Sequence, residues 1–446
     1  MVLTREGAAV ASDPAVLAAR NGVKKEERRL GSEPARLAAS AGLRRLRVLF
    51  LNRSYYPDVE ATGQLLSELC ADLATRHEVT VIAGRPNFVD ARTGHEVHEG
   101  VQVVRVRNLR FKKVRLLGRA VGLLSYLVQA LWAGLRQRRP DVIVVETDPP
   151  VLGVLGAFLK WWHGSRLVFY LQDLFPEVGL ILGRLRPGPL ASFLRWATQV
   201  GLKNADRVVV LGEDMRRRVL ARGVEAAKIA IVPNWADAEA LRPATGENPL
   251  RREWGVEGRF VVMYSGNLGL SQSLGHVLEA AELLRGEPVE FVFVGEGAAK
   301  AGLMARAQER RLDNVRFLPY QPKNRLGESL GAADVHLIPL QRGLAGYIVP
   351  SKLYGILAVG RPYIAAVDEE SEVAAITREW GAGLRVEPDS AEAVAAAVRW
   401  SLAHREELAA MGRRGRQLAE MHFDRRHSVE SFERVLSELQ GGVSGS

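Results

Sequence analysis

Cysteine is the scarcest residue of this sequence, with Cys70 the single example among 446 residues. One thiol excludes an intramolecular disulfide framework and a cysteine-rich metal cluster. Cys70 lies in the apolar pattern of residues 65–70, so we expect a buried core thiol and not a nucleophile. The lack of disulfides favours a reducing, cytoplasmic environment.

Residues 101–140 carry ten arginines and lysines and no acidic residue. The net charge of the whole chain is +10, so the remainder of the chain is formally neutral. Within this block, residues 120–135 form an uncharged apolar run of 16 residues. That run is shorter than the ~20 residues that cross a bilayer. Two interpretations stay open: segment 105–139 docks on an anionic membrane surface, or it contains a helix packed on a parallel sheet with a basic rim. Nucleic acid is a competing polyanion, but we find no nucleic-acid-binding module and expect no such partner.

Several well-known catalytic motifs are also absent. The sequence has no H-E-x-x-H, no Walker lysine after G-x-x-x-x-G and no complete G-x-G-x-x-G. These absences argue against a zinc protease, a P-loop enzyme and a standard dinucleotide-binding enzyme.

Short apolar strands alternate with helices from Arg47 onward, which predicts parallel sheets covered on both faces. The expected strands are 47–51, 77–83, 101–106, 141–146, 166–171, 207–211, 259–265, 290–294, 315–318, 335–339, 363–367 and 384–386. The expected helices are 65–74, 120–135, 151–162, 190–203, 274–285, 300–310, 352–359 and 391–404.

The alternation is interrupted at Pro233–Asp237, where we place a hinge. We therefore predict two Rossmann-like, doubly wound domains, 45–235 and 236–423, facing a central cleft at the carboxyl ends of their strands. A helix at 424–440 is expected to pack back on the first domain. Residues 1–44 lack the apolar segment of a signal peptide, and we expect a mobile extension.

The segment Gly346–Pro362 is typical of a loop, a short helix and a following strand. Pro350 suits the first turn of a helix, where Ser351, Lys352 and Leu353 would offer free backbone N–H groups to an anion. Lys352 adds a positive charge at the same point. This arrangement favours a nucleoside-diphosphate ligand, although an ordinary α/β repeat with a proline cap has the same pattern.

Glycine turns follow three predicted strands, at Thr62–Gly63, Ser265–Gly269 and Gly295–Gly297. Glycine lets the backbone approach a phosphate closely, and Asn267 and Gln272 add neutral donors. Ordinary turns would produce the same pattern.

Acidic residues near strand ends are Asp58, Glu146, Asp148, Asp173 and Glu177. Asp173 follows the strand at 166–171. It would either hold or deprotonate a substrate hydroxyl, or cap a helix.

Taken together, these motifs resemble those of retaining glycosyltransferases of the GT-B fold, from the family four type that builds bacterial O-antigen, capsule and colanic-acid polysaccharides. The resemblance extends from about Arg47 to Leu439. The segments that carry it are 51–58, 61–65, 173–177, 205–211, 232–235, 265–269 and 349–352.

The resemblance implies sugar transfer with retention at the anomeric carbon, no obligatory metal and no cofactor. The donor would be a UDP- or GDP-sugar, and the acceptor a lipid-linked glycan. With the residue patterns, it predicts catalytic roles for Lys352, Asp173 and Arg53. The predicted donor-binding residues are Gly63, Gly266, Asn267, Gln272, Gly295, Leu318, Tyr347, Ser351, Leu353 and Glu372.

The sequence departs from the wider family in two places. The common form has glutamates at the positions of Tyr347 and Gly355, and Arg and Lys at those of Asn267 and Gln272. We therefore expect Lys352 to carry more of the phosphate charge and Glu372 to take over a hydroxyl contact. Two alternatives remain, a non-catalytic sugar-nucleotide-binding scaffold and a sugar-nucleotide epimerase of the same fold.

Overall fold

The computed structural model describes residues 44–58, 61–86, 93–107, 116–244 and 246–441, with the backbone alone given at 116–120 and 441. The predicted mobile extension at 1–44 therefore lies outside the described residues, except for Arg44. The basic side chains predicted at Arg110, Lys112, Lys113, Arg115 and Arg119 also lie outside them.

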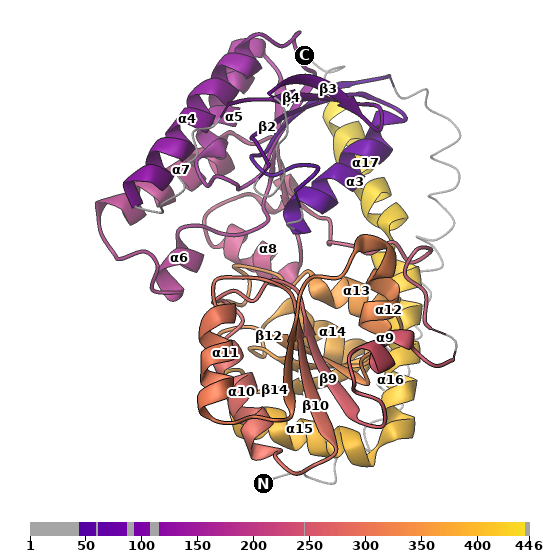
Figure 1. Ribbon diagram of the computed structural model, residues 1–446. Coiled ribbons are helices and arrows are strands. Elements are labelled where there is room, and N and C mark those ends of the chain that lie inside the picture. The colour runs from indigo at the N-terminus through magenta and orange to yellow at the C-terminus, as the bar shows by residue number, and fades with distance from the viewer. Residues whose placement is uncertain (1–43, 59–60, 87–92, 108–115, 245, 442–446) are drawn as a thin grey trace, which may run out of the picture. The chain divides into compact units, whose positions relative to one another are not determined.

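The first domain is built on an eight-stranded sheet in the order β3-β4-β2-β1-β5-β6-β7-β8 (Figure 1). Its strands are β1 Arg47–Leu51, β2 Glu78–Ala83, β3 Gly94–His98, β4 Val101–Arg105, β5 Val142–Val145, β6 Arg166–Tyr170, β7 Arg207–Val210 and β8 Ile229–Ile231. Every pair is parallel except the edge hairpin of β3 and β4. The central strands are almost continuously buried, as expected of a parallel sheet covered on both faces.

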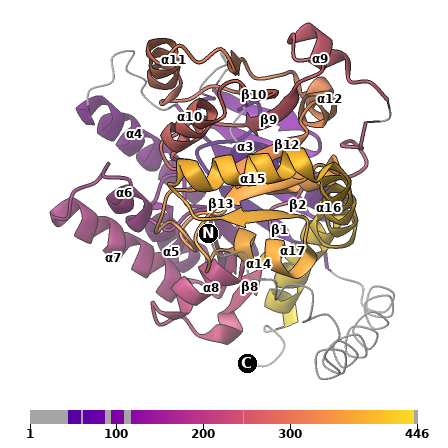
Figure 2. The same cartoon turned by 90° about the horizontal axis from the view of Figure 1, so that it is seen from below.

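Helices cover both faces of this sheet. They are α3 Ala61–Ala74, α4 Leu116–Leu135, α5 Leu152–His163, α6 Glu177–Ile181, α7 Pro189–Asn204, α8 Glu213–Leu220 and the 3₁₀ turn η3 Ala226–Lys228. Helix α5 packs against both α4 and α7, and the three lie together in Figure 1. Figure 2 shows α4 and α7 on the same side of the molecule. Glycines permit this close packing, since a Cβ on Gly153 or Gly201 would collide with the facing helix and with Phe169.

The second domain has a six-stranded, all-parallel sheet in the order β11-β10-β9-β12-β13-β14. Its strands are β9 Phe260–Ser265, β10 Val289–Val294, β11 Val315–Leu318, β12 Val335–Pro339, β13 Tyr363–Ala366 and β14 Gly383–Val386. Its helices are α9 Pro249–Glu253, α10 Leu274–Leu283, α11 Lys300–Glu309, η4 Lys323–Arg325, α12 Leu326–Gly331, α13 Lys352–Ala358, α14 Glu372–Trp380, α15 Ala391–Ala403, α16 Arg405–Leu418 and the π-helical turn η5 Ala419–Phe423. The predicted fold class, two doubly wound α/β domains, is confirmed.

The last helix, α17 Arg425–Gly441, packs on the first domain, against α3. Its Phe432 is fully buried and lies 6.1 Å from the ring of Phe50 and 5.6 Å from that of Tyr170, measured between centroids. Its Glu433 accepts a hydrogen bond of 2.9 Å from His77.

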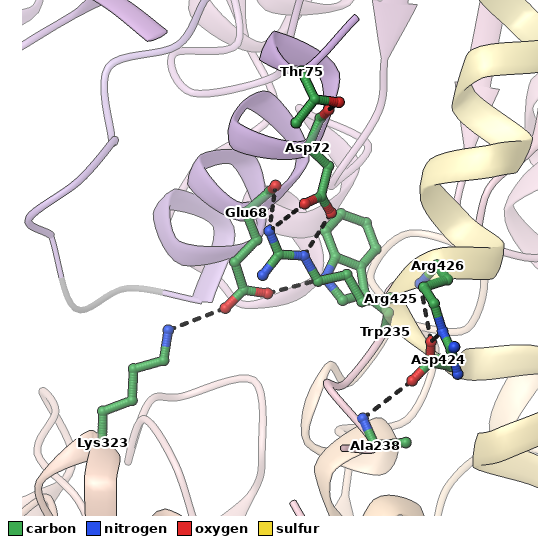
Figure 3. A network of polar contacts seen from close by, with 9 residues as sticks. All are labelled: Glu68, Asp72, Thr75, Trp235, Ala238, Lys323, Asp424, Arg425 and Arg426. Carbon is green, nitrogen blue, oxygen red and sulfur yellow. Dashed lines mark hydrogen bonds and ion pairs between the residues drawn. The ribbon is translucent and has the colours of Figure 1, made fainter. Parts of the chain in front are cut away.

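The chain crosses between the domains twice, after β8 and before α17, and the two crossings bind each other. Ala236 donates its N–H to the carbonyl of Phe423, and Arg425 donates its N–H to the carbonyl of Ala236. Around this crossing, Glu68 of α3 accepts from Trp235 and pairs with Lys323 of the second domain (Figure 3).

The predicted basic surface at 105–139 needs one correction. Arg105 is buried, because its guanidinium pairs with Glu96 and donates to the carbonyl of Tyr56. Residues 120–135 do form a helix, as part of α4. None of the helices in the described part of the chain has the length and hydropathy to span a membrane.

Candidate functional site

The C-terminal domain places Lys352 at the carboxyl end of its sheet, where α13 begins. The ammonium group lies 4.5 Å from the ring centroid of Tyr264, and a Cβ on Gly266 would lie 3.5 Å from its Cε. Burial lowers the pKa of Lys352 to about 8, with no compensating partner. Among the described residues, no carboxylate pairs with this cation. A desolvated, unpaired ammonium group is suited to binding an anion.

Two glycine loops lie beside this lysine, after β9 and β10. Gly266 and Gly295 both have positive φ, at 138° and 144°, and they touch each other so closely that a Cβ on Gly295 would overlap the carbonyl of Gly266. Asn267 and Gln272 border Gly269 in the first loop. The Oε1 of Gln272 is buried without a hydrogen-bond partner among the described residues. The glycines thus let two loops meet next to Lys352.

The predicted helix start needs correction. Pro350 lies outside α13, which begins at Lys352 after Ser351 and is only 7 residues long. The N–H of Leu353 donates to the carbonyl of Pro350 over 3.3 Å, so it is not free for a ligand. The anion-binding capacity therefore rests on the Lys352 ammonium group more than on the helix terminus.

The first domain gathers charged side chains at the carboxyl ends of β1, β5 and β6. Arg53 clamps Asp148 through Nε at 3.2 Å and Nη2 at 2.9 Å. Burial, followed by the charge of Asp148, raises the pKa of Asp173 to about 7. Beneath them, Glu146 is fully buried, and burial raises its pKa well above the usual range. The arrangement offers a carboxyl that changes charge near neutral pH beside an arginine–aspartate pair.

A backbone bridge joins these two groups of residues. Asp173 and Ile348 form an antiparallel bridge, and Leu174 donates its N–H to the carbonyl of Tyr347 over 2.9 Å. The guanidinium of Arg218 lies 4.6 Å from the ring centroid of Tyr347. Asp173 thereby contacts the same loop, residues 346–351, that leads into Lys352.

Glu372, predicted to contact a substrate hydroxyl, has protein partners from the first domain. Its Oε2 accepts a hydrogen bond of 2.9 Å from the N–H of Glu213, and its methylene and carboxyl lie against Gly212. Its own N–H donates to Asp214 over 2.9 Å. Burial, together with the charge of Asp214, raises the pKa of Glu372. The side chain thus connects the helix starts of α8 and α14, and we interpret it as an interdomain contact.

The other predicted donor-binding residues have mainly packing partners. Gly63 lies in the first turn of α3, nearest to Ser54 and Tyr55. Leu318 ends β11, and its carbonyl accepts the N–H of Gly295. Of the remaining acidic candidates, Asp58 accepts from Ser54, and Glu177 pairs with Arg195 and Arg222.

Sequence reasoning missed three residues that shape this region: Tyr264, Asp214 and Arg218. Tyr264 was detectable as the aromatic residue two positions before Gly266. Asp214 and Arg218 gave no such signal, because their partners lie in the other domain. In the described part of the chain, no group of three or more His, Cys, Asp or Glu side chains is placed to hold a metal ion.

Family comparisons agree with this two-domain geometry. Residues 60–235 match the glycosyl transferase 4-like domain, and residues 247–418 match the glycosyl transferases group 1 domain. The chain belongs to the family of GT-B glycosyltransferases that combine these two domains.

Individual relatives lie within the same family. The chain is 30% identical over 414 residues to the "Putative colanic acid biosynthesis glycosyl transferase WcaI" of Escherichia coli K12, covering 89% of this chain and 100% of that protein. It is also 30% identical to the "Probable glycosyltransferase WbjE" of Pseudomonas aeruginosa, covering 64% of this chain and 72% of that protein. Among solved structures, Anabaena Alr3699/HepE in complex with UDP-glucose matches with a TM-score of 0.68 at 16% identity, covering 88% of this chain and 100% of that one.

Proposed function

We propose that this protein is a retaining glycosyltransferase of surface polysaccharide synthesis. Its donor is a UDP- or GDP-sugar and its acceptor a lipid-linked glycan. The relative named for colanic acid biosynthesis supports the pathway class, and the fold shared with a UDP-glucose complex supports the donor class.

The observation that carries this proposal is the state of Lys352. Lys352 is only partly exposed, and a partly desolvated ammonium group without an anionic partner costs free energy in the empty protein. A donor diphosphate would supply the missing negative charge, and Gly266 leaves room beside the lysine for a phosphate to approach. Donor binding would therefore raise the pKa of Lys352 toward its ordinary value and keep the side chain charged.

The proposed reaction needs no nucleophile from the protein. A bond forms between the acceptor oxygen and the anomeric carbon of the sugar, while the bond from that carbon to the diphosphate oxygen breaks. The acceptor proton passes to the departing diphosphate on the same face, which gives retention. Lys352 stabilises the negative charge that develops on the leaving group.

Asp173 and the Arg53–Asp148 pair are proposed to hold the acceptor. In its ionised form, Asp173 accepts a hydrogen bond from the acceptor hydroxyl and so orients the attacking oxygen. The bridge from Asp173 to Ile348 couples this acceptor group to the loop before Lys352. The two substrates would thus be positioned by one connected loop system.

The test is a transfer assay with radiolabelled UDP- and GDP-sugars and a lipid extract as acceptor, with the product's anomeric configuration read by NMR. We expect one donor to label a lipid product with the configuration retained, in the presence of EDTA as well as with Mg²⁺. Loss of activity in EDTA would contradict metal independence, and an inverted product would contradict retention. Binding of the nucleotide without transfer would favour the scaffold, whereas interconversion of the free donor's sugar would favour the epimerase.

A further inference from the structure

The outer surface of α4, α5 and α7 exposes an unusual number of large apolar side chains. The exposed ones are Val121, Leu124, Val128, Trp132, Phe158, Trp161, Trp162, Leu190, Phe193 and Trp196. We call this set the aromatic face. All four tryptophans of the chain that are more than half exposed belong to it.

The three helices that carry the aromatic face pack together and are joined by hydrogen bonds. Helix α5 contacts both of the other two helices, and the three lie together in Figure 1. The C-terminal ends of the three helices are tied together, since Lys160 donates to the carbonyl of Asn204 at 2.8 Å and His163 lies 3.1 Å from the carbonyl of Gly134. The exposed rings therefore extend from a fixed platform.

The three helices of the aromatic face carry no acidic side chain. None of the 20 residues of α4, the 12 of α5 or the 16 of α7 is Asp or Glu. Exposed arginines flank the helices, with Arg136, Arg138 and Arg139 after α4 and Arg184 and Arg186 before α7. Arg136 lies over the ring of Trp132, 5.2 Å from its centroid.

A basic pocket opens where α5 and α7 end. Its volume is about 370 Å³. Its charged lining consists of Lys160, Lys203, Arg166, Arg207 and Lys228 against Asp206 and Glu438. Lys160 directly precedes Trp161, and Lys203 lies 7 positions after Trp196, about two helical turns along the same side. The pocket thus adjoins the aromatic face and has three positive charges in excess.

We propose that the aromatic face docks on an anionic lipid bilayer, with the pocket of Lys203 taking a lipid headgroup phosphate. Tryptophan beside arginine is the combination that prefers the membrane interface. The excess of positive charge on and around these helices complements anionic headgroups. The same excess opposes a second copy of this chain, because two such faces would repel each other.

This inference goes beyond the proposed function and does not depend on it. It also enlarges the surface predicted from sequence, which comprised segment 105–139 alone and included the buried Arg105. The additional tryptophans lie on α5 and α7, whose sequences carry no long basic run. Folding is what brings them beside Trp132.

The first experiment is flotation of the full chain with phosphatidylcholine vesicles, with and without phosphatidylglycerol. We expect binding when phosphatidylglycerol is present and little without it. The double variant Trp161→Ser/Trp196→Ser should weaken binding by roughly tenfold or more. Lys203→Glu should weaken it to a similar extent, by reversing one charge near the surface.

Matched controls lie in the second domain and its boundary. Met304→Ser and Met421→Ser remove exposed apolar side chains elsewhere, and Arg413→Glu reverses an exposed charge on α16. These variants should bind vesicles like the wild type. A complementary readout is quenching of tryptophan fluorescence by brominated phosphatidylcholine in the anionic vesicles, which the double tryptophan variant should largely lose.

Several outcomes would overturn the proposal. They are no flotation, equal flotation without phosphatidylglycerol, or wild-type flotation of the double variant. A concentration-dependent dimer or an acidic protein partner that disappears in the double variant, without vesicle binding, would assign the face to protein contacts instead. Thermal shifts by UDP and GDP on the same variants separate this result from the proposed function, since donor binding should be unchanged.

Discussion

Two titratable side chains of the site have pKa values moved toward neutrality from opposite directions. Burial lowers the pKa of Lys352 to about 8, whereas burial and the charge of Asp148 raise the pKa of Asp173 to about 7. Both shifts disfavour the charged form, which is the expected cost of desolvation without an opposite charge. Such residues are common at functional sites because a substrate can supply the missing partner.

The pH dependence of turnover follows from these two residues. We expect kcat/KM to rise through pH about 7 as Asp173 ionises and to fall above about 8 as Lys352 loses its proton. Asp173→Asn should remove the rise, and Lys352→Arg should remove the fall while keeping a positive charge. A profile for Lys352→Arg that falls as in the wild type would assign that limb to another group.

Lys352 also affects how the free energy of unfolding changes with pH. Its folded pKa of about 8 lies below the ordinary 10.5, so the unfolded chain binds this proton more tightly. The contribution of Lys352 therefore makes the free energy of unfolding of the empty protein rise between pH about 8 and 10.5. Below pH about 8 the lysine is charged in the folded protein, and its full desolvation cost lowers the stability. Urea titrations of the wild type and Lys352→Met across that range would measure this difference.

At the scale of elements, helix starts from the two domains cap each other. Asp214 of α8 accepts the N–H groups of Gly346 and Glu372, while Glu372 of α14 accepts that of Glu213. Free N–H groups at a helix start need acceptors, and here each helix takes one from the other domain. The contact gives the partly buried Glu372 its partners at both helix starts, and none of the contacts described joins it to Lys352.

Substitution of Glu372 distinguishes this capping role from the donor-binding role predicted by sequence. Glu372→Ala should lower the free energy of unfolding by about 1–2 kcal/mol, whereas Glu372→Gln should lose less because its amide oxygen still accepts from Glu213. The neighbouring exposed Glu370→Ala is the control. A raised KM for the donor in Glu372→Gln with unchanged stability would support the donor-binding role instead.

Long apolar elements were predictable from sequence, and short charged ones were not. Strands such as β1 and β13 read directly as buried runs. Strand β3 was missed because Gly94–His98 is an exposed, polar edge strand. Helix α8 was missed because five of its 8 residues are charged, which leaves only a short apolar side. Helix α16 contains Gly412, which disfavours helix but is needed for contact with Gly360.

The site residues that lie at the carboxyl ends of strands could be predicted from the sequence. Parallel strands bring their carboxyl ends to one edge, which places Asp148 near Arg53 and Gly266 near Gly295. Contacts between domains depend on how two separate sheets meet, and no local pattern records that. Glu372 and Tyr347 therefore have partners, Glu213 and Arg218, that sequence reasoning did not suggest.

At the scale of the whole molecule, the chain returns to its first domain at the end. Helix α17 contributes Phe432 to the core under β1 and β6, and Arg425 holds Asp72 of α3 through two hydrogen bonds, of 2.7 and 2.8 Å (Figure 3). The first domain is therefore built from two separate stretches of sequence.

Removal of the Phe432 ring tests this architecture. Phe432→Ala should lower the free energy of unfolding by about 3–5 kcal/mol, while the exposed Phe193→Ala should change it by less than about 0.5 kcal/mol. Hydrogen exchange should accelerate in β1 and β6 of the first domain. Acceleration confined to β12 and β13 would show that α17 belongs energetically to the second domain.

The most direct test of the central claim is the thermal stabilisation of the wild type, Lys352→Arg and Lys352→Ala by UDP, GDP and ADP. Lys300→Ala serves as the control, because Lys300 is already paired with Glu296. We predict that one nucleotide stabilises the wild type, by about 2.7 kcal/mol at 100 times its dissociation constant. Lys352→Arg and Lys300→Ala should keep most of this stabilisation, and Lys352→Ala should lose it. No stabilisation by any nucleotide, or an undiminished effect in Lys352→Ala, would contradict the assignment of Lys352 to the donor diphosphate.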